Sequence, residues 1–129
     1  MAYAVIGKIR MAYSQLINYA EQLNASMVDL QIASGLTYTN IKSMMLDFND
    51  LAKTVGKSTL EVANAANDWF RAGYEGQEAS ELTNASMHLS TLGMIDSSQA
   101  TSYLISVLKG WKIEAKEVME GVDKLTAVD

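Results

Sequence analysis

Several residue types that support specific chemistries are missing or scarce in this chain of 129 residues. It contains no cysteine, which excludes disulfide bonds and thiolate chemistry, and no proline, which favours long uninterrupted helices. His88 is the only histidine, and Ala85 stands where a helical Glu-x-x-His metal motif would need its glutamate. Because His88 is the only imidazole that could act as a base, we see no catalytic triad that would activate a serine. We therefore expect no enzymatic activity, no cofactor and no metal site.

Long apolar runs and an excess of positive charge are also absent. No window approaches the roughly 20 apolar residues of a membrane-spanning helix, so we expect no membrane span in this segment. Ten basic residues are outnumbered by fifteen acidic ones, which gives a net charge of −5. Because binding to nucleic acid depends on Lys and Arg that neutralise phosphates, we expect no specific nucleic-acid partner. Apolar residues make up 49% of the chain, enough for one domain with its own core.

The first 34 residues predict one long amphipathic helix, over about residues 3–34. Apolar residues recur there at alternating spacings of three and four, at Ile6, Ile9, Tyr13, Leu16, Ala20, Leu23, Met27 and Leu30. We call this stripe the heptad seam, because it follows the a and d positions of a coiled coil. Such a helix would be about 45 Å long. Two interpretations stay open: the helix packs along its whole length on the later helices, or the seam faces a partner and makes a homo-oligomer.

Glycines divide the rest of the chain into short amphipathic helices. The apolar spacing predicts helices over residues 38–54, 59–72, 77–92, 97–109 and from about 114 onward. The expected helix stops are Gly35, Gly56, Gly73, Gly93 and Gly110, because the residue that ends a helix often adopts a positive φ. Two cap patterns mark helix starts: Ser58 with Glu61, a capping box, and Asp96 with Gln99, a variant of it.

These patterns together predict an all-α fold. A long N-terminal heptad helix, residues 1–34, is followed by a compact array of about five short antiparallel helices, residues 35–129, and we expect the two parts to pack as a single unit. The last helical pattern is still in phase at Leu125 and Val128, and no stop signal follows it. We therefore expect the chain to be an excised domain of a longer protein.

Four large aromatic residues lie near the expected helix ends: Trp69, Phe70, Tyr74 and Trp111. Such side chains either fill the core where helices turn or form an exposed patch that recognises a partner. Their positions beside the stop glycines favour the core.

The order of these elements resembles the core region of phage tail tape measure proteins. That family has a helix that ends in a small-residue turn, a stretch between two stop glycines, a helix of small residues and a further glycine-bounded segment. The corresponding pieces here are residues 32–35, 51–73, 79–92 and 93–110, and the resemblance covers about residues 24–125. One departure is that Trp69 and Phe70 stand where the family often has a small residue or a methionine.

The resemblance implies a non-catalytic structural protein of a phage or prophage tail. Such a protein lies in the tail tube, sets tail length during assembly and leaves the tube as DNA is delivered. It would be made in the bacterial host cytoplasm and end in the virion, with copies of itself and tail tube or tail assembly proteins as partners. The alternative is a free-standing helical interaction module that docks through the heptad helix.

Overall fold

The computed structural model describes residues 2–111, 114 and 117–122, and every regular element among them is an α-helix. The helices are α1 (Ala2–Ser34), α2 (Tyr38–Val55), α3 (Thr59–Arg71), α4 (Gly76–Gly93) and α5 (Ser97–Trp111), and a short helix follows at 117–122. Helices α2 to α5 begin and end within about two residues of the expected positions. The expected all-α fold, with a long first helix and shorter ones after it, is confirmed. Leu125 and Val128 lie outside the described residues.

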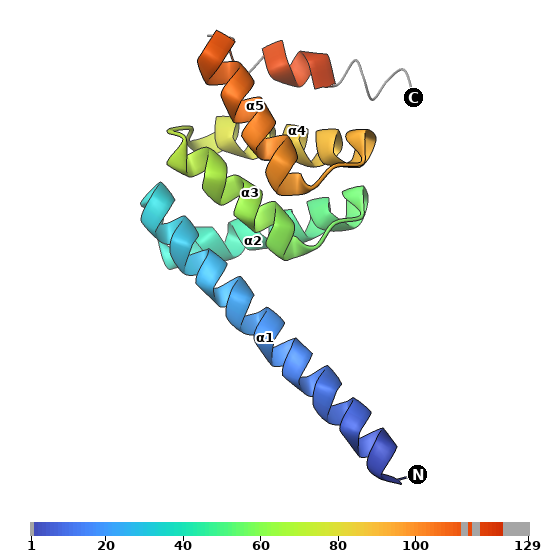
Figure 1. The fold of residues 1–129 in the computed structure, drawn as a ribbon. Helices are drawn as coiled ribbons and strands as arrows, with labels where there is room; N and C mark the ends of the chain where they lie inside the picture. Colours follow the sequence, from blue (N-terminus) through green and yellow to red (C-terminus); the bar gives the residue numbers. More distant parts are fainter. Residues whose placement is uncertain (1, 112–113, 115–116, 123–129) are drawn as a thin grey trace.

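Helix α3 is the centre of the bundle. It contacts α1, α2, α4 and α5, and Figure 1 shows it between α1 and α2 on one side and α4 and α5 on the other. Its buried alanines, Ala63, Ala65 and Ala66, present little side-chain bulk, which lets neighbouring helices approach closely on more than one side. Small residues in the middle of this helix therefore explain why it can be surrounded.

The core gathers around α3 from all five helices. Its fully buried large members are Leu30 of α1, Ile41 of α2, Val62 and Trp69 of α3, and Leu82 and Met87 of α4, while Leu104 and Leu108 add the inner face of α5. Trp69 Nε1 donates a hydrogen bond of 2.8 Å to Ser86 Oγ, and Ser86 Oγ donates one of 3.0 Å to the carbonyl of Leu82. The indole N–H is thus satisfied inside the core, as a buried donor must be.

Three of the expected glycine stops adopt the left-handed conformation. Gly35 has φ 72°, Gly56 has φ 71° and Gly73 has φ 102°. After α3, the N–H of Tyr74 donates to the carbonyl of Trp69 at 3.1 Å, and the N–H of Gly73 donates to that of Phe70 at 3.0 Å. These two bonds satisfy carbonyls at the helix end and form a Schellman motif, which needs a left-handed residue at Gly73.

The other two expected stops are wrong in position. Gly93 is the last residue of α4, and the left-handed residue after it is Met94, with φ 54°. A Cβ at Gly93 would lie 3.7 Å from Ile95 Cγ1, so Gly93 lies where Ile95 folds back on the helix end. Gly110 lies inside α5, which continues to Trp111, and it has no positive φ. A glycine inside a helix costs only about 1 kcal/mol, so it did not end this one.

The two expected helix caps have different outcomes. Ser58 and Glu61 form a reciprocal capping box: the Glu61 N–H donates to Ser58 Oγ at 3.1 Å, and the Ser58 N–H donates to Glu61 Oε2 at 2.9 Å. At the start of α5, neither the Asp96 side chain nor the Gln99 side chain accepts from the backbone N–H of the other residue, although both residues are described. Asp96 contributes only its carbonyl, which accepts from the N–H of Ala100, so the expected variant of the capping box does not form.

Candidate interaction surface

The heptad seam of α1 divides into an exposed part and a buried part. Ile6, Ile9, Tyr13 and Leu16 each expose between 48% and 65% of their surface, and Ala20 is exposed as well. The seam is then progressively covered: Leu23 and Met27 are half-buried and Leu30 is fully buried. Figure 1 shows why, since α1 passes the bundle only at its C-terminal end and its N-terminal end stands far from it.

The buried part of α1 is held by α2 and α3. This part of α1 contacts both helices, and Ser26 Oγ donates a hydrogen bond of 3.1 Å to Asn64 Oδ1 of α3. The interpretation that the helix packs along its whole length on the later helices is therefore wrong, and the interpretation that the seam faces a partner stays a prediction. The helix packs on its own domain from about Leu23 onward, and it leaves the seam open before that point.

The open part of α1 is apolar beyond the seam itself. Val5, Met11 and Ile17 are also exposed, and Lys8, Arg10 and Glu21 are the only charged residues between positions 5 and 22. An apolar surface of this extent is unusual on a monomer and marks interaction sites. We call residues 5–20 of α1 the open stripe.

The four aromatic residues do not share one environment. Trp69 and Phe70 are buried, and Tyr74 is half-buried with its ring 5.3 Å from that of Trp69 in an edge-on contact of 77°. Burial raises the pKa of the Tyr74 phenol above its ordinary 10.0, and the neighbouring Glu78 carboxylate raises it further. Trp111, by contrast, is 77% exposed. The expectation that all four aromatics favour the core is therefore wrong for Trp111, because no described element covers this end of α5.

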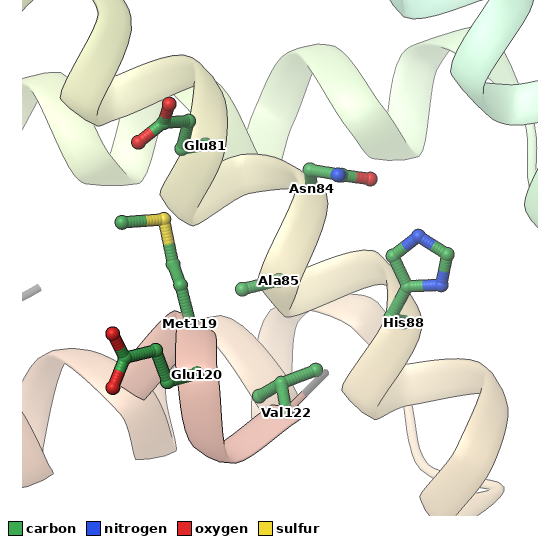
Figure 2. Close-up of a pocket in the computed structure, with 7 residues that line it drawn as sticks. All are labelled: Glu81, Asn84, Ala85, His88, Met119, Glu120 and Val122. Atoms are coloured by element: carbon green, nitrogen blue, oxygen red, sulfur yellow. The ribbon is translucent and has the colours of Figure 1, made fainter. Parts of the chain in front are cut away.

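A cavity of about 340 Å³ lies between α4 and the helix at 117–122. Ala85 and Val122 are buried beside it, and Glu81 and Glu120 carry carboxylates at its edge. Figure 2 shows His88 on the opposite side of this cavity from the two carboxylates. The described residues hold no group of three or more His, Cys, Asp or Glu arranged for a metal ion.

A second cavity, of about 230 Å³, lies between α3 and the start of α5, and it is acidic. Glu61, Asp68 and Asp96 line it. Partial burial raises the pKa of Asp68 above its ordinary 3.8, and the Arg71 guanidinium lowers it by less. No lysine, histidine or arginine lines this cavity to pair with its carboxylates, so the geometry offers neither an acid–base pair nor an anion site.

The sequence patterns missed three features of the structure. Thr37 caps α2 by accepting from the N–H of Asn40 at 3.3 Å, and Gly76 begins α4 with φ 56°. The cavity beside α4 was also missed, because it joins residues far apart in the chain. A threonine before an amphipathic run was the only available signal for the first of these.

None of the described helices has the length and hydropathy to cross a bilayer.

Comparison with known protein families gives one match. Residues 45–129 match the model of the phage-related minor tail proteins. No curated protein and no solved structure matched the chain. The matched region begins within α2 and includes α3, α4 and α5, and a protein of this family has a structural role in a phage tail and is associated with the virion. Because the match covers more than half of the sequence, the chain belongs to the phage-related minor tail protein family.

Proposed function

We propose that this protein is the helical core of a tail tape measure protein, which lies in the tail tube and helps to set tail length. The family match over residues 45–129 carries the proposal, since it assigns the chain to the phage tail. The finer role is supported by the resemblance of the ordered helix stops to the tape measure core. The form of the molecule is also suited to the role, because α1 extends well beyond the bundle (Figure 1).

A helix measures length because its rise per residue is constant. At 1.5 Å per residue, α1 with its 33 residues is about 50 Å long, and further helical chain would add length in proportion. The chain contains no proline, so no proline kink interrupts its helices. The net charge of −5 disfavours lasting attachment to DNA, which fits a protein that leaves the tube when DNA passes.

The partners that this role requires are tail tube or tail assembly proteins and other copies of the chain. The open stripe of α1 is the surface best suited to them, since it is apolar, extended and uncovered by the described part of its own chain. We assign no catalytic step to this protein. The two cavities lack the acid–base or metal constellation on which one could be built.

Tail length measured by electron microscopy tests the proposal directly. Four extra heptads inserted into α1 after Ala12, about 28 residues, add about 42 Å of helix. If the protein sets length, phage that carry the insertion should have tails longer by about that amount. A control insertion of the same size and composition in a different tail gene should leave tail length unchanged. Tails of unaltered length that contain the longer protein would refute the tape measure role and leave the tail assignment standing.

An immunoblot separates the proposal from the alternative of a free-standing interaction module. Purified particles and host lysate are compared with an antibody against this domain. A protein enriched in particles and much larger than 14.1 kDa supports a tape measure. A band near 14.1 kDa that is confined to the lysate contradicts it and favours the interaction module.

A further inference from the structure

The cavity of about 230 Å³ between α3 and the start of α5, which we call the acidic cavity, is lined by oxygen-bearing side chains. They are three carboxylates, one amide and two hydroxyls, from Glu61, Asp68, Asp96, Asn64, Ser97 and Ser98. No basic residue among the described ones lines this cavity, although the chain has ten. A cation that neutralises the three carboxylates therefore has to come from elsewhere.

The carboxylates of the acidic cavity are available to such a cation. The side chains of Asp68 and Asp96 make no hydrogen bond or ion pair within the described residues. Burial raises the pKa of Asp68 by more than the nearby Arg71 guanidinium lowers it, so the ionised form lacks sufficient compensation. Glu61 uses only Oε2, which accepts from the Ser58 N–H at 2.9 Å. A bound cation would compensate charges that the chain itself leaves unpaired.

A buried hydroxyl without a partner also faces this cavity. Ser97 exposes only 7% of its surface, and its side chain makes no hydrogen bond within the described residues. Among those residues, the one side-chain polar atom that is sealed from solvent without a partner is Asn67 Oδ1. The Ser97 hydroxyl is therefore directed into the cavity that it lines. Because buried hydroxyls are nearly always hydrogen-bonded, this one indicates a ligand there.

The size and spacing of the site favour one guanidinium group. The volume is below the roughly 300 Å³ at which pockets for drug-sized ligands begin, so it suits a single side chain. Glu61 and Asp68 are seven residues apart on α3, which separates them by about 10 Å along the helix. A point cation joins acceptors at most about 6 Å apart, twice the length of one hydrogen bond. A guanidinium carries five N–H donors that point in different directions, so it reaches acceptors on separate helices.

We propose that the acidic cavity binds the guanidinium of an arginine side chain on a partner protein. The guanidinium donates to the carboxylates of Asp68 and Asp96 and to the hydroxyl of Ser97, while Glu61 adds negative charge. The net charge of −5 disfavours a second copy of this chain as the source and favours a partner of opposite charge. The site is separate from the open stripe, and it would be present whether or not the protein is a tape measure.

A nuclear magnetic resonance titration of the chain tests the site. The probe is N-acetyl-arginine amide, which carries a guanidinium and no other charge, and it should shift the backbone amide signals of Ser97 and Ser98 saturably. N-acetyl-lysine amide should bind at least about fivefold more weakly, because its ammonium is a compact point charge. N-acetyl-citrulline amide, which has a similar shape and no charge, should give no saturable shift.

Substitutions in the cavity test which groups hold the guanidinium. Asp68→Asn and Asp96→Asn should each weaken binding of the arginine probe at least about tenfold, because each removes a charge-assisted hydrogen bond. Ser97→Ala should weaken it by a smaller factor and keep the fold, since that hydroxyl has no hydrogen bond to lose. Asp47→Asn is the matched control, because it makes the same change of charge at an exposed residue of α2 and should bind like the wild type.

The stability of the variants separates binding from a structural role. Asp68→Asn should lose affinity for the arginine probe without losing stability near pH 7, because its carboxylate is buried without sufficient compensation. Saturable shifts that are lost in Asp68→Asn and Asp96→Asn and kept in Asp47→Asn support the proposal. Spermidine or calcium chloride that binds at the same amides more tightly than the arginine probe would overturn it in favour of a free cation. No saturable shift with the arginine probe, or equal affinity of Asp47→Asn and Asp96→Asn, would overturn the site itself.

Discussion

The hydrogen bond between Trp69 and Ser86 gives a prediction that the structure makes quantitative. The Trp69 side chain is completely buried, and its indole N–H donates to Ser86 Oγ at 2.8 Å. The substitution Ser86→Ala leaves that N–H without a partner inside the core. An unsatisfied buried donor costs about 1–3 kcal/mol, and the better helix propensity of alanine returns up to about 0.5 kcal/mol. We expect a net loss of about 0.5–3 kcal/mol in the free energy of unfolding.

Urea denaturation followed by far-UV circular dichroism measures this loss without depending on tryptophan fluorescence. Ser80→Ala is the matched control, because Ser80 is exposed on the same helix and has no hydrogen bond to lose. That variant should be neutral or slightly stabilised. If Ser86→Ala and Ser80→Ala had equal midpoints, the Trp69 bond would contribute nothing and the reasoning would be refuted.

A double-mutant cycle separates the hydrogen bond from simple loss of packing. Trp69→Phe removes the donor, while Ser86 Oγ keeps its bond to the Leu82 carbonyl. In that background Ser86→Ala should cost at least about 1 kcal/mol less than it does in the wild type, because no indole N–H is left unpaired. Equal costs in the two backgrounds would show that the two side chains are not coupled.

Three further predictions concern helix ends and one carboxylate. Gly56→Ala should lower the free energy of unfolding by about 1–2 kcal/mol, because the φ of 71° at Gly56 disfavours any Cβ although the surrounding space is open. Gly110→Ala, inside α5, should raise the free energy of unfolding by up to about 1 kcal/mol. Equal urea midpoints for the two variants would contradict this. Ser58→Ala removes the N-cap of α3 and should cost about 1 kcal/mol in the same assay, and an unchanged midpoint would contradict the importance of the cap. The raised pKa of Asp68 means that the folded state binds its proton more tightly than the unfolded state does, so its contribution to stability falls as pH rises from about 3.8 through the raised pKa. Asp68→Asn should therefore raise the melting temperature near pH 7 and change it little near pH 4. The gain in the free energy of unfolding near pH 7 should be less than about 1 kcal/mol, because the carboxylate is partly solvated. An effect independent of pH would contradict the stated cause.

Most of the fold could be predicted from sequence because its signals are local. The capping box of Ser58 and Glu61 acts within one helical turn, and the positive φ of Gly73 follows from one turn of backbone hydrogen bonds. The position of a helix end is less predictable when two neighbouring residues compete for the left-handed conformation. At the end of α4, Gly93 stays in the helix and Met94, the residue after it, adopts the left-handed conformation.

Contacts between distant parts of the chain could not be predicted. The bond between Ser26 and Asn64 joins α1 to α3, and the cavity beside α4 depends on where the helix at 117–122 lies. Trp111 illustrates the same limit. A large aromatic beside a glycine predicts a buried corner, and it is exposed here because no described element covers it.

The heptad seam shows what a periodic pattern can and cannot specify. Alternating spacings of three and four state that one face of a helix prefers to be buried, and they hold equally at Ile9, where the side chain is exposed, and at Leu30, where it is not. The lengths of the helices decide which part of the seam is covered. Helices α2 and α3 are short and contact only the C-terminal end of α1, which has 33 residues. The excess length of α1 over its own bundle leaves the rest of the seam open. The apolar positions that the bundle does not reach are therefore the ones where an external partner should bind.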